Sequence, residues 1–448
     1  MANTELFDKY GLFSAKVPRY TSYPPANRFL PDVGHKYQVP WLRTVPTDKA
    51  VSIYIHIPFC RRLCWFCACR TQGTKSLRPV EAYTVTLLQE LEAVAAALPD
   101  GIKMGRLHLG GGTPTLLSPA LMTTLLTAVY EKFETADDFE FSAEIDPTEA
   151  PDDILTCLAS HGLNRASVGV QDFEPQVQDA IGRRQSALQT KRVIRSLRAL
   201  GVKSVNLDLL YGLPYQTETT LTDTLQQVLL LNPDRIALYG YAHVPTMSKR
   251  QVMIPTEALP NARERFHLAN IAAQILQDDG LLPVGIDHFA RSNDGLAIAA
   301  ANGTLRRNFQ GYTDDPYDTL IGLGASAISR FNQGYLQNAV STAAYSERIT
   351  TGGLAAHKGV ELTDDDKLLG ALIEQIMCFG RIDLAKLPPD QRACASEICL
   401  NLTTQFAEIT SFNGETLAVH PEATIMIRII AGAIDNGFVS GTKHSLAI

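Results

Sequence analysis

The 448-residue chain lacks an excess of basic charge, a long apolar run and the features of an export signal. Its 40 Lys and Arg against 47 Asp and Glu give a net charge of −7, which argues against nucleic acid as the main partner because phosphate binding needs a basic face. No apolar stretch approaches the roughly 20 residues that cross a bilayer, so we expect no membrane insertion. The first residues, MANTELFDKY, have no basic stretch followed by an apolar core, which favours a cytoplasmic protein.

Cysteine is scarce outside one short segment. The chain has eight cysteines, and half of them lie between residues 60 and 69. A large chain without a secretory signal is expected to stay reduced, which disfavours a disulfide framework. The other cysteines lie among apolar residues in predicted helices and are interpreted as small buried side chains: Cys157, Cys378, Cys394 and Cys399.

The cysteine-rich segment follows a predicted strand. Ile53, Ile55 and Ile57 alternate with other residues, which is the period of a strand, and Pro58 ends it. Cys60, Cys64 and Cys67 then follow with C-x3-C-x2-C spacing. Zinc sites usually have a second Cys/His pair downstream, and no such pair follows here. The spacing therefore predicts a 4Fe-4S cluster held by these three thiolates, with one iron left open for a reactant.

The residues beside this loop leave alternatives open. Cys69 could be a fourth ligand, but it lies two residues after Cys67 and the short spacing would strain the loop, so we expect that it is not one. A structural zinc site, a disulfide pair and inert buried thiols are the other interpretations. Tyr54, Trp65 and Phe66 fit a partly dry pocket, although aromatic neighbours are more often core residues.

From about residue 49 to residue 245, predicted strands alternate with amphipathic helices. Ser118 followed by Pro119 is a typical helix start. The alternation predicts a curved parallel sheet with right-handed crossovers, whose active site lies at the carboxyl ends of the strands. The predicted strands span residues 51–57, 106–109, 139–145, 165–170, 204–209 and 235–241.

Polar or glycine residues follow each predicted strand, as a site at this edge requires. A glycine-rich loop at 110–115 lacks the Lys of a phosphate-binding loop. Asp208 lies in an apolar run, so its carboxylate must be paired or bound to a ligand. The other strand-end residues are Glu144, Asp146, Gln171, Asp172, Tyr241, Ala242 and His243, and Arg183 opens the segment that follows the fourth strand.

Three segments further along the chain are interpreted without a role in the active site. Residues 281–291 are expected to form another strand and loop. The GLGAS sequence at 322–326 resembles a dinucleotide-binding loop, but no strand is predicted before it, so that interpretation is rejected. Lys249, Arg250, Arg263 and Arg265 are interpreted as a solvated basic face.

A set of short motifs in fixed order carries a family resemblance. From Pro18 to about Ser329 the chain contains PRYTSYP, HIPFC, GGGTPT, GVQDF, DLLYGLP, YAHVP, DHFAR and NFQGYT. Together with the three-cysteine loop they resemble the oxygen-independent coproporphyrinogen III oxidases, which are radical S-adenosylmethionine enzymes. The resemblance implies an α/β fold: a partial (β/α)6 barrel with an N-terminal arm and a small, mainly helical C-terminal domain.

The expected domains are an arm at 1–48 that covers the active site, a barrel with an extension of its core at 49–350, and a helical, winged-helix-like domain at 355–448. The prolines of the arm, including Pro31 and Pro40, are expected to break any long element. The tail departs from the family motifs at 379–381, 419–424 and 434–437, so its part in substrate handling stays open.

The resemblance also implies roles for individual residues. Cys60, Cys64 and Cys67 would bind the cluster, and Arg19 would contact a substrate carboxylate. Independently of the resemblance, we expect Tyr54, His56 and Cys69 to assist electron or proton passage. The positions implied for one S-adenosylmethionine are Tyr54, Phe66, Gly111, Gly112, Thr113, Glu144, Gln171, Arg183, Asp208 and Ala242, and those near a second are Phe309, Gln310 and Ile328.

The implied activity is the oxidative decarboxylation of two propionates of coproporphyrinogen III to vinyl groups, giving protoporphyrinogen IX. It would use a 5'-deoxyadenosyl radical from S-adenosylmethionine. A reduced flavodoxin- or ferredoxin-like protein would supply electrons, and the enzyme would be monomeric. The alternatives are a radical S-adenosylmethionine haem chaperone or another porphyrin-modifying paralogue, an iron–sulfur electron carrier or sensor, and a zinc-binding structural protein.

Overall fold

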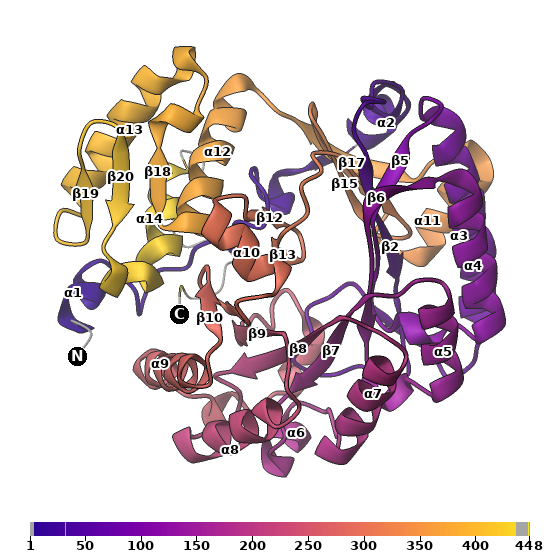
Figure 1. Cartoon of the computed structure of the whole chain (residues 1–448), viewed down its shortest axis with the longest axis horizontal. Helices are drawn as coiled ribbons and strands as arrows, with labels where there is room; N and C mark the ends of the chain where they lie inside the picture. Colours follow the sequence, from indigo (N-terminus) through magenta and orange to yellow (C-terminus); the bar gives the residue numbers. More distant parts are fainter. Residues whose placement is uncertain (1–3, 32, 436–446, 448) are drawn as a thin grey trace.

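The computed structural model describes residues 4–31, 33–435 and 447. Its centre is a 13-stranded sheet with the order β1-β17-β16-β15-β14-β2-β5-β6-β7-β8-β9-β11-β10. Helices α3 (Arg78–Ala97), α4 (Pro119–Lys132), α5 (Asp152–Ser160), α7 (Ala187–Ala199) and α8 (Glu218–Leu229) lie along the outer side of the curved sheet (Figure 1). The fold is the predicted α/β partial barrel.

The six predicted strands are confirmed, and several are longer than predicted. They are β2 (Val51–Ile57), β5 (Lys103–Gly111), β6 (Glu134–Ile145), β7 (Arg165–Gln171), β8 (Ser204–Tyr211) and β9 (Arg235–Gly240), paired in parallel in this order. Ile53, Ile55 and Ile57 are almost fully buried against the outer helices. Because side chains alternate along a strand, Tyr54 and His56 point to the opposite, inner face.

Further strands extend the sheet on both sides. β14 (Leu320–Leu323) pairs in parallel with β2, and β15 (Ile328–Phe331), β16 (Gly334–Asn338), β17 (Ala356–Glu361) and β1 (Leu30–Pro31) follow in antiparallel pairing. β10 (Leu282–Val284) and β11 (His288–Ala290) form a hairpin beside β9, where a strand was predicted. A strand does lead into GLGAS, contrary to the prediction. The segment still lacks the helix that a dinucleotide loop requires, because β15 follows it.

The C-terminal elements combine helices with a small sheet. They are α12 (Asp364–Phe379), α13 (Arg392–Gln405), α14 (Ile427–Ile434) and the sheet β18 (Arg381–Asp383), β20 (Thr416–Val419) and β19 (Thr410–Phe412). Thr363 caps α12, since its hydroxyl accepts from the N–H of Asp366 and the Asp366 carboxylate accepts in return. These elements lie at the end of the molecule away from α3 and α4 (Figure 1). The domain boundaries stay predictions.

The N-terminal arm packs on both parts of the molecule. Phe7, Leu12 and Val17 join the hydrophobic core of the C-terminal elements, and α1 (Thr4–Lys9) lies beside them (Figure 1). The prediction that prolines break the arm is wrong at α2 (Val33–Arg43), which contains Pro40. Trp41, next to Pro40, is buried and packs edge-on against Phe331, and this packing offsets the backbone hydrogen bond that proline cannot make.

The four cysteines outside the loop were predicted to be buried. Cys157, Cys378 and Cys399 are buried as predicted, but Cys394 is exposed. Cys394 and Cys399 are five positions apart, so they lie on different sides of α13. Cys399 and its neighbours already fill the inner side of this helix.

None of the helices in the described residues is long and apolar enough to span a bilayer.

Candidate active site

The cysteine loop is closed by a short parallel bridge at the carboxyl end of β2. β3 (Phe59–Cys60) pairs with β4 (Gln72–Gly73), and the N–H of Thr74 donates to the Cys60 carbonyl at 3.0 Å. Within the loop the N–H of Cys67 donates to the Cys64 carbonyl at 3.3 Å. The three cysteines are therefore carried by one closed loop rather than by separate elements.

Residues after β9 hold this loop from the other side of the barrel mouth. Gln251, which is buried, donates to the Phe66 carbonyl at 2.9 Å and to the Ala242 carbonyl at 3.0 Å. Arg250 donates to the Thr71 carbonyl at 3.0 Å and to its hydroxyl at 2.8 Å. The interpretation of Arg250 as part of a solvated face is wrong for this reason. Sequence reasoning missed Gln251, since a lone amide in an irregular segment gives no periodic signal.

The thiols of the loop have different surroundings. Burial raises the pKa of Cys60 to about 11. The neighbouring Cys69 thiol lowers the pKa of Cys67 to about 6, and Cys67 in turn raises the pKa of Cys69 well above its usual value. The Cys64 sulfur accepts from Nη1 of Arg183 at 3.5 Å.

The three cysteines of the loop are free thiols and are available as ligands. The described cysteines are all free thiols, which contradicts the disulfide alternative. In the part of the chain that the structure describes, no three His, Cys, Asp or Glu side chains converge on one point as ligands of a single ion do. A cuboidal 4Fe-4S cluster binds each thiolate at a separate iron, so its ligands need not converge on one point.

The glycine loop after β5 comes close to the first cysteine. A Cβ on Gly112 would lie 2.5 Å from the Phe59 carbonyl oxygen and 3.0 Å from the Cys60 sulfur. Gly111 has φ of +113°, and a Cβ there would lie 2.6 Å from the ring of His56. Glycine is required at both positions, and the loop exposes its backbone groups at the barrel mouth.

His56 and Tyr54 form a hydrogen-bonded chain on the inner face of β2. Nε2 of His56 donates to the Arg70 carbonyl at 3.1 Å, because a carbonyl can accept only. Nδ1 then accepts from the Tyr54 hydroxyl at 2.9 Å. Burial lowers the pKa of His56, so the imidazole is neutral in this arrangement. The Tyr54 ring also stacks on His108, with ring centroids 5.7 Å apart.

Two predicted carboxylates line the inner face near the glycine loop. Glu144 accepts from the N–H of Gly111 at 3.0 Å and lies 3.7 Å from Nε2 of His108. Burial alone would raise the pKa of Glu144, but the contacts with His108 and Gly111 lower it below its usual value.

Asp208 accepts from Ser167 at 2.9 Å and from Asn206 at 2.7 Å, so the expected pairing is present. Burial raises the pKa of Asp208 to about 6.

Arg183 connects the cysteine loop to two strand ends. Besides its contact with Cys64, it lies 3.2 Å from the Asp146 carboxylate and donates to the Gly169 carbonyl at 3.0 Å. Gln171, the last residue of β7, has φ of +69°. Arg62, within the cysteine loop, approaches the same Asp146 at 3.6 Å. Asp146 thus joins the loop to β6 and to the segment after α6 (Pro175–Ala180).

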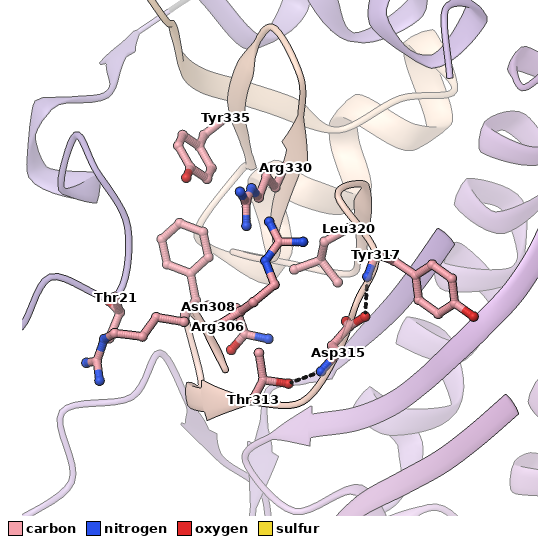
Figure 2. A pocket seen from close by; sticks show the side chains of 11 residues that line it. Thr21, Arg306, Asn308, Thr313, Asp315, Tyr317, Leu320, Arg330 and Tyr335 are labelled. Carbon is pink, nitrogen blue, oxygen red and sulfur yellow. Dashed lines mark hydrogen bonds between the residues drawn. The ribbon is translucent and has the colours of Figure 1, made fainter. Parts of the chain in front are cut away.

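The remaining predicted residues lie away from the cysteine loop. Phe309 lines a small cavity of about 20 Å³ beside Arg307, Arg330 and Tyr335, shown in Figure 2. Gln310 is exposed, and its carbonyl accepts from Tyr239 at 3.4 Å. Ile328 is on β15 and is not among the residues that line this cavity, so the three positions implied for a second cofactor are not brought together around it.

Arg19 donates to the Gly240 carbonyl at 2.8 Å and packs over the Tyr239 ring, so the arm does reach the carboxyl end of β9.

The fold and the three-cysteine loop at the end of the first barrel strand define a radical S-adenosylmethionine protein. The Radical SAM superfamily model matches residues 54–228. The relatives named oxygen-independent coproporphyrinogen III oxidase include one from Cereibacter sphaeroides, 49% identical over all of both chains, and one from Paracoccus denitrificans, 46% identical over all of both chains. The solved coproporphyrinogen III oxidase of Escherichia coli, described as a radical SAM enzyme, superimposes with a TM-score of 0.89 at 34% identity, covering 94% of this chain and 98% of that one. This chain belongs to the oxygen-independent coproporphyrinogen III oxidase family.

Proposed function

We propose that this chain oxidises coproporphyrinogen III without oxygen and converts two of its propionate side chains to vinyl groups, giving protoporphyrinogen IX. The observation that carries the proposal is full-length identity of up to 49% to relatives named for this oxidation, together with an intact three-cysteine loop. The haem-chaperone, electron-carrier and structural-zinc alternatives do not account for both features.

Cys60, Cys64 and Cys67 are the residues that would hold a 4Fe-4S cluster. The strand-end groups around them would hold S-adenosylmethionine. When bound, the cluster and S-adenosylmethionine supply hydrogen-atom abstraction from an unactivated C–H bond. Each propionate loses one hydrogen atom, carbon dioxide and one further electron to become a vinyl group.

The side chains at the barrel mouth are suited to binding a charged, hydroxyl-rich cofactor. Glu144, kept ionised by its contacts, can accept from an ammonium group, and Asp208 can accept from ribose hydroxyls. Gly111 and Gly112 let a ligand approach the backbone. Arg183 is ready to bind a carboxylate beside the Cys64 sulfur. These roles act by positioning a reactant and excluding water, and none of them requires a protein nucleophile.

His56 and Tyr54 have a positioning role in this proposal. The neutral His56 ring keeps its proton at Nε2 and ties the Arg70 carbonyl, within the cysteine loop, to the inner face of β2. Cys69, which lies two residues after Cys67 and lowers its pKa, would adjust the electron density at that ligand and thereby assist electron passage. A reduced flavodoxin- or ferredoxin-like protein would be the electron source, and we propose a monomer that acts in the cytoplasm.

An anaerobic assay tests the proposal. The protein is reconstituted with iron and sulfide and supplied with reductant, S-adenosylmethionine and coproporphyrinogen III. The porphyrins are then oxidised and separated by chromatography. Vinyl-bearing product supports the proposal, whereas release of 5'-deoxyadenosine without porphyrin change favours a haem chaperone or another paralogue. Cys64→Ala should abolish both the iron–sulfur absorbance and the product, and Cys157→Ala, in a helix of the outer layer, should retain both.

A further inference from the structure

The cysteine loop reaches the surface of the protein beside the segment that follows β9. The hydroxyl of Ser248 donates to the Cys67 carbonyl at 3.1 Å, and Arg250 donates to the Cys69 carbonyl at 3.4 Å. Cys69 is exposed, whereas the other cysteines of the loop are buried or half-buried. Residues 68–70 are all exposed, so they are the edge at which the loop meets solvent.

Basic charge is concentrated in the two segments that meet at this edge. The chain as a whole has more acidic than basic residues, 47 against 40. Residues 58–79 nevertheless contain five basic residues and no acidic one, and residues 244–253 contain two basic residues and no acidic one. Because the two segments contact one another, they form a basic surface on an acidic protein. The basic residues are Arg61, Arg62, Arg70, Lys75, Arg78, Lys249 and Arg250.

Several of these charges are available to a partner. Arg70 and Lys249 are exposed and make no ion pair in the part of the chain that the structure describes. Arg250 donates to carbonyl and hydroxyl groups of the loop, which are neutral, so its positive charge is not compensated. Arg62 pairs with Asp146 and therefore adds less charge to the surface.

The predicted solvated basic face is thus only partly present. Lys249 and Arg263 are exposed as predicted. The prediction is wrong for Arg265, which is buried, as it is for Arg250. Lys249 is the residue of this set whose charge faces solvent beside the cysteine loop.

Apolar side chains lie among the basic ones. Met247, Val252 and Met253 are 55%, 70% and 56% exposed, although large apolar side chains are usually buried. Lys249–Met253 form the 3-10 helix η4, in which residues three apart share a side. Met253 therefore lies on the side of Arg250, which reaches the cysteine loop, and Val252 lies on the side of Lys249.

We call this region the loop-edge surface. Methionine and arginine are enriched at protein interfaces, and an apolar centre with a charged rim is the usual arrangement there. Positive charge at the rim attracts an acidic partner and speeds its association. The loop-edge surface consists of Arg70, Met247, Lys249, Val252 and Met253.

The position of the loop-edge surface suits electron transfer. Electron transfer slows steeply with distance, so a donor must dock where the cysteine loop comes to the surface. Complexes of electron-transfer proteins are transient and bury less than about 1,200 Å², so a small patch is sufficient for them.

We propose that the loop-edge surface docks a small acidic one-electron carrier protein of the flavodoxin or ferredoxin kind. One electron leaves the reduced carrier and reduces the iron–sulfur cluster by one electron. With a flavodoxin, the anionic flavin hydroquinone becomes the neutral semiquinone, and no proton moves. The inference rests on the proposed function, because it takes the cluster and its need for an electron source from it.

The first test measures docking without turnover. An oxidised flavodoxin and an oxidised ferredoxin, both acidic, are titrated calorimetrically into the reconstituted full-length protein at low and high salt. Binding should weaken as salt rises, because salt screens the charges. Lys249→Glu should raise the Kd about tenfold at low salt and flatten the salt dependence, and Lys249→Arg should bind like the wild type. Met253→Ser should raise the Kd about fivefold and leave the salt dependence unchanged.

The second test follows reduction of the cluster by stopped-flow absorbance. Flavodoxin hydroquinone should reduce the cluster of Lys249→Glu about tenfold more slowly than that of the wild type at low salt. The radical cation of methyl viologen, a small reductant of positive charge, should reduce both proteins at similar rates, which shows that the cluster is intact. Lys103→Glu is the matched control, since Lys103 is exposed at the amino end of β5, on the opposite edge of the sheet. It should behave like the wild type with both reductants.

Several outcomes overturn the inference. One is equal carrier binding by the wild type and Lys249→Glu, and another is a wild type that binds neither carrier while methyl viologen reduces its cluster. A raised KM for coproporphyrinogen III in Lys249→Glu, with unchanged carrier binding, would assign the surface to the substrate carboxylates. A change in sedimentation of Lys249→Glu, with unchanged carrier binding, would assign it to a second copy of the chain.

The two proposals can fail separately. A wild type that binds the carriers through Lys249 but forms no vinyl product with any reductant refutes the proposed activity alone. A wild type that forms vinyl product, together with carrier binding that does not depend on Lys249 or Met253, refutes this inference alone.

Discussion

Asp435, at the end of α14, anchors the N-terminal arm, and its replacement by Asn should release the arm. The Asp435 carboxylate is fully buried and accepts from both terminal nitrogens of Arg28, at 2.9 and 2.7 Å. It also accepts from the hydroxyls of Tyr20 and Tyr23, both at 3.2 Å. Burial raises the pKa of Tyr23 to about 12 and that of Tyr20 further, so both hydroxyls remain donors at neutral pH.

The size of the effect follows from these contacts. Asp435→Asn removes the negative charge and turns one acceptor into a donor that faces other donors. Breaking a buried ion pair costs about 3–5 kcal/mol. Because the Arg28 side chain is 30% exposed and can be rehydrated, we expect a value near 3 kcal/mol. This corresponds to roughly a hundredfold increase in the population of the detached arm.

Hydrogen–deuterium exchange measures this opening directly. Peptides that cover residues 12–29 should exchange about a hundredfold faster in Asp435→Asn, while peptides from β5 to β7 should be unchanged. Asp8→Asn is the control, since Asp8 pairs with Arg263 on the surface and such pairs contribute at most about 1 kcal/mol. Unchanged arm exchange in Asp435→Asn would refute the reasoning, as would equal acceleration throughout the chain.

Three further predictions concern the glycine loop, the fourth cysteine and a buried carboxylate. Gly112→Ala should lower the iron bound per chain, because the added Cβ would displace Cys60. Gly352→Ala is the control, since a Cβ there meets nothing within 4 Å, and it should bind iron normally. Full iron content in Gly112→Ala would contradict the prediction. Cys69→Ala should retain iron but lose turnover, and loss of iron, measured by metal analysis, would make Cys69 a ligand. Burial raises the pKa of Glu90 from 4.5 to about 7 in the folded state. Between pH 4.5 and about pH 7 the folded chain therefore keeps a proton on Glu90 that the unfolded chain has released. The free energy of unfolding should therefore fall by about 3 kcal/mol as pH rises through this range. Glu90→Gln should remove this pH dependence of the free energy of unfolding, measured by denaturant titrations between about pH 5 and pH 8. If the wild type and Glu90→Gln lose stability in parallel as pH rises, the prediction is wrong.

The barrel could be predicted because its signals are local. Apolar runs with a strand period and capped amphipathic helices specify parallel strands, and the position of an active site at their carboxyl ends then follows from topology. Asp208 illustrates this: a carboxylate in an apolar run needs partners, and Ser167 and Asn206 supply them.

The features that were missed depend on contacts between distant segments. β14 is a run of four residues whose strand character comes from pairing with β2, more than 260 positions earlier in the chain. Arg250 and Arg265 lie in polar segments that resemble surface, and only the folded chain shows that one binds the cysteine loop and the other is buried. Helix α2 forms despite Pro40 because the sheet covers its apolar side.

The pairing of β2 with β14 has a consequence for the order in which the protein matures. The cysteine loop is synthesised early, yet the strand that carries it has a neighbour on one side alone until Leu323 has left the ribosome. Gln251, which holds the loop carbonyls, is also synthesised late. Iron and sulfide delivered to a nascent chain would meet an unfinished loop, so cluster assembly is expected to follow release of the chain.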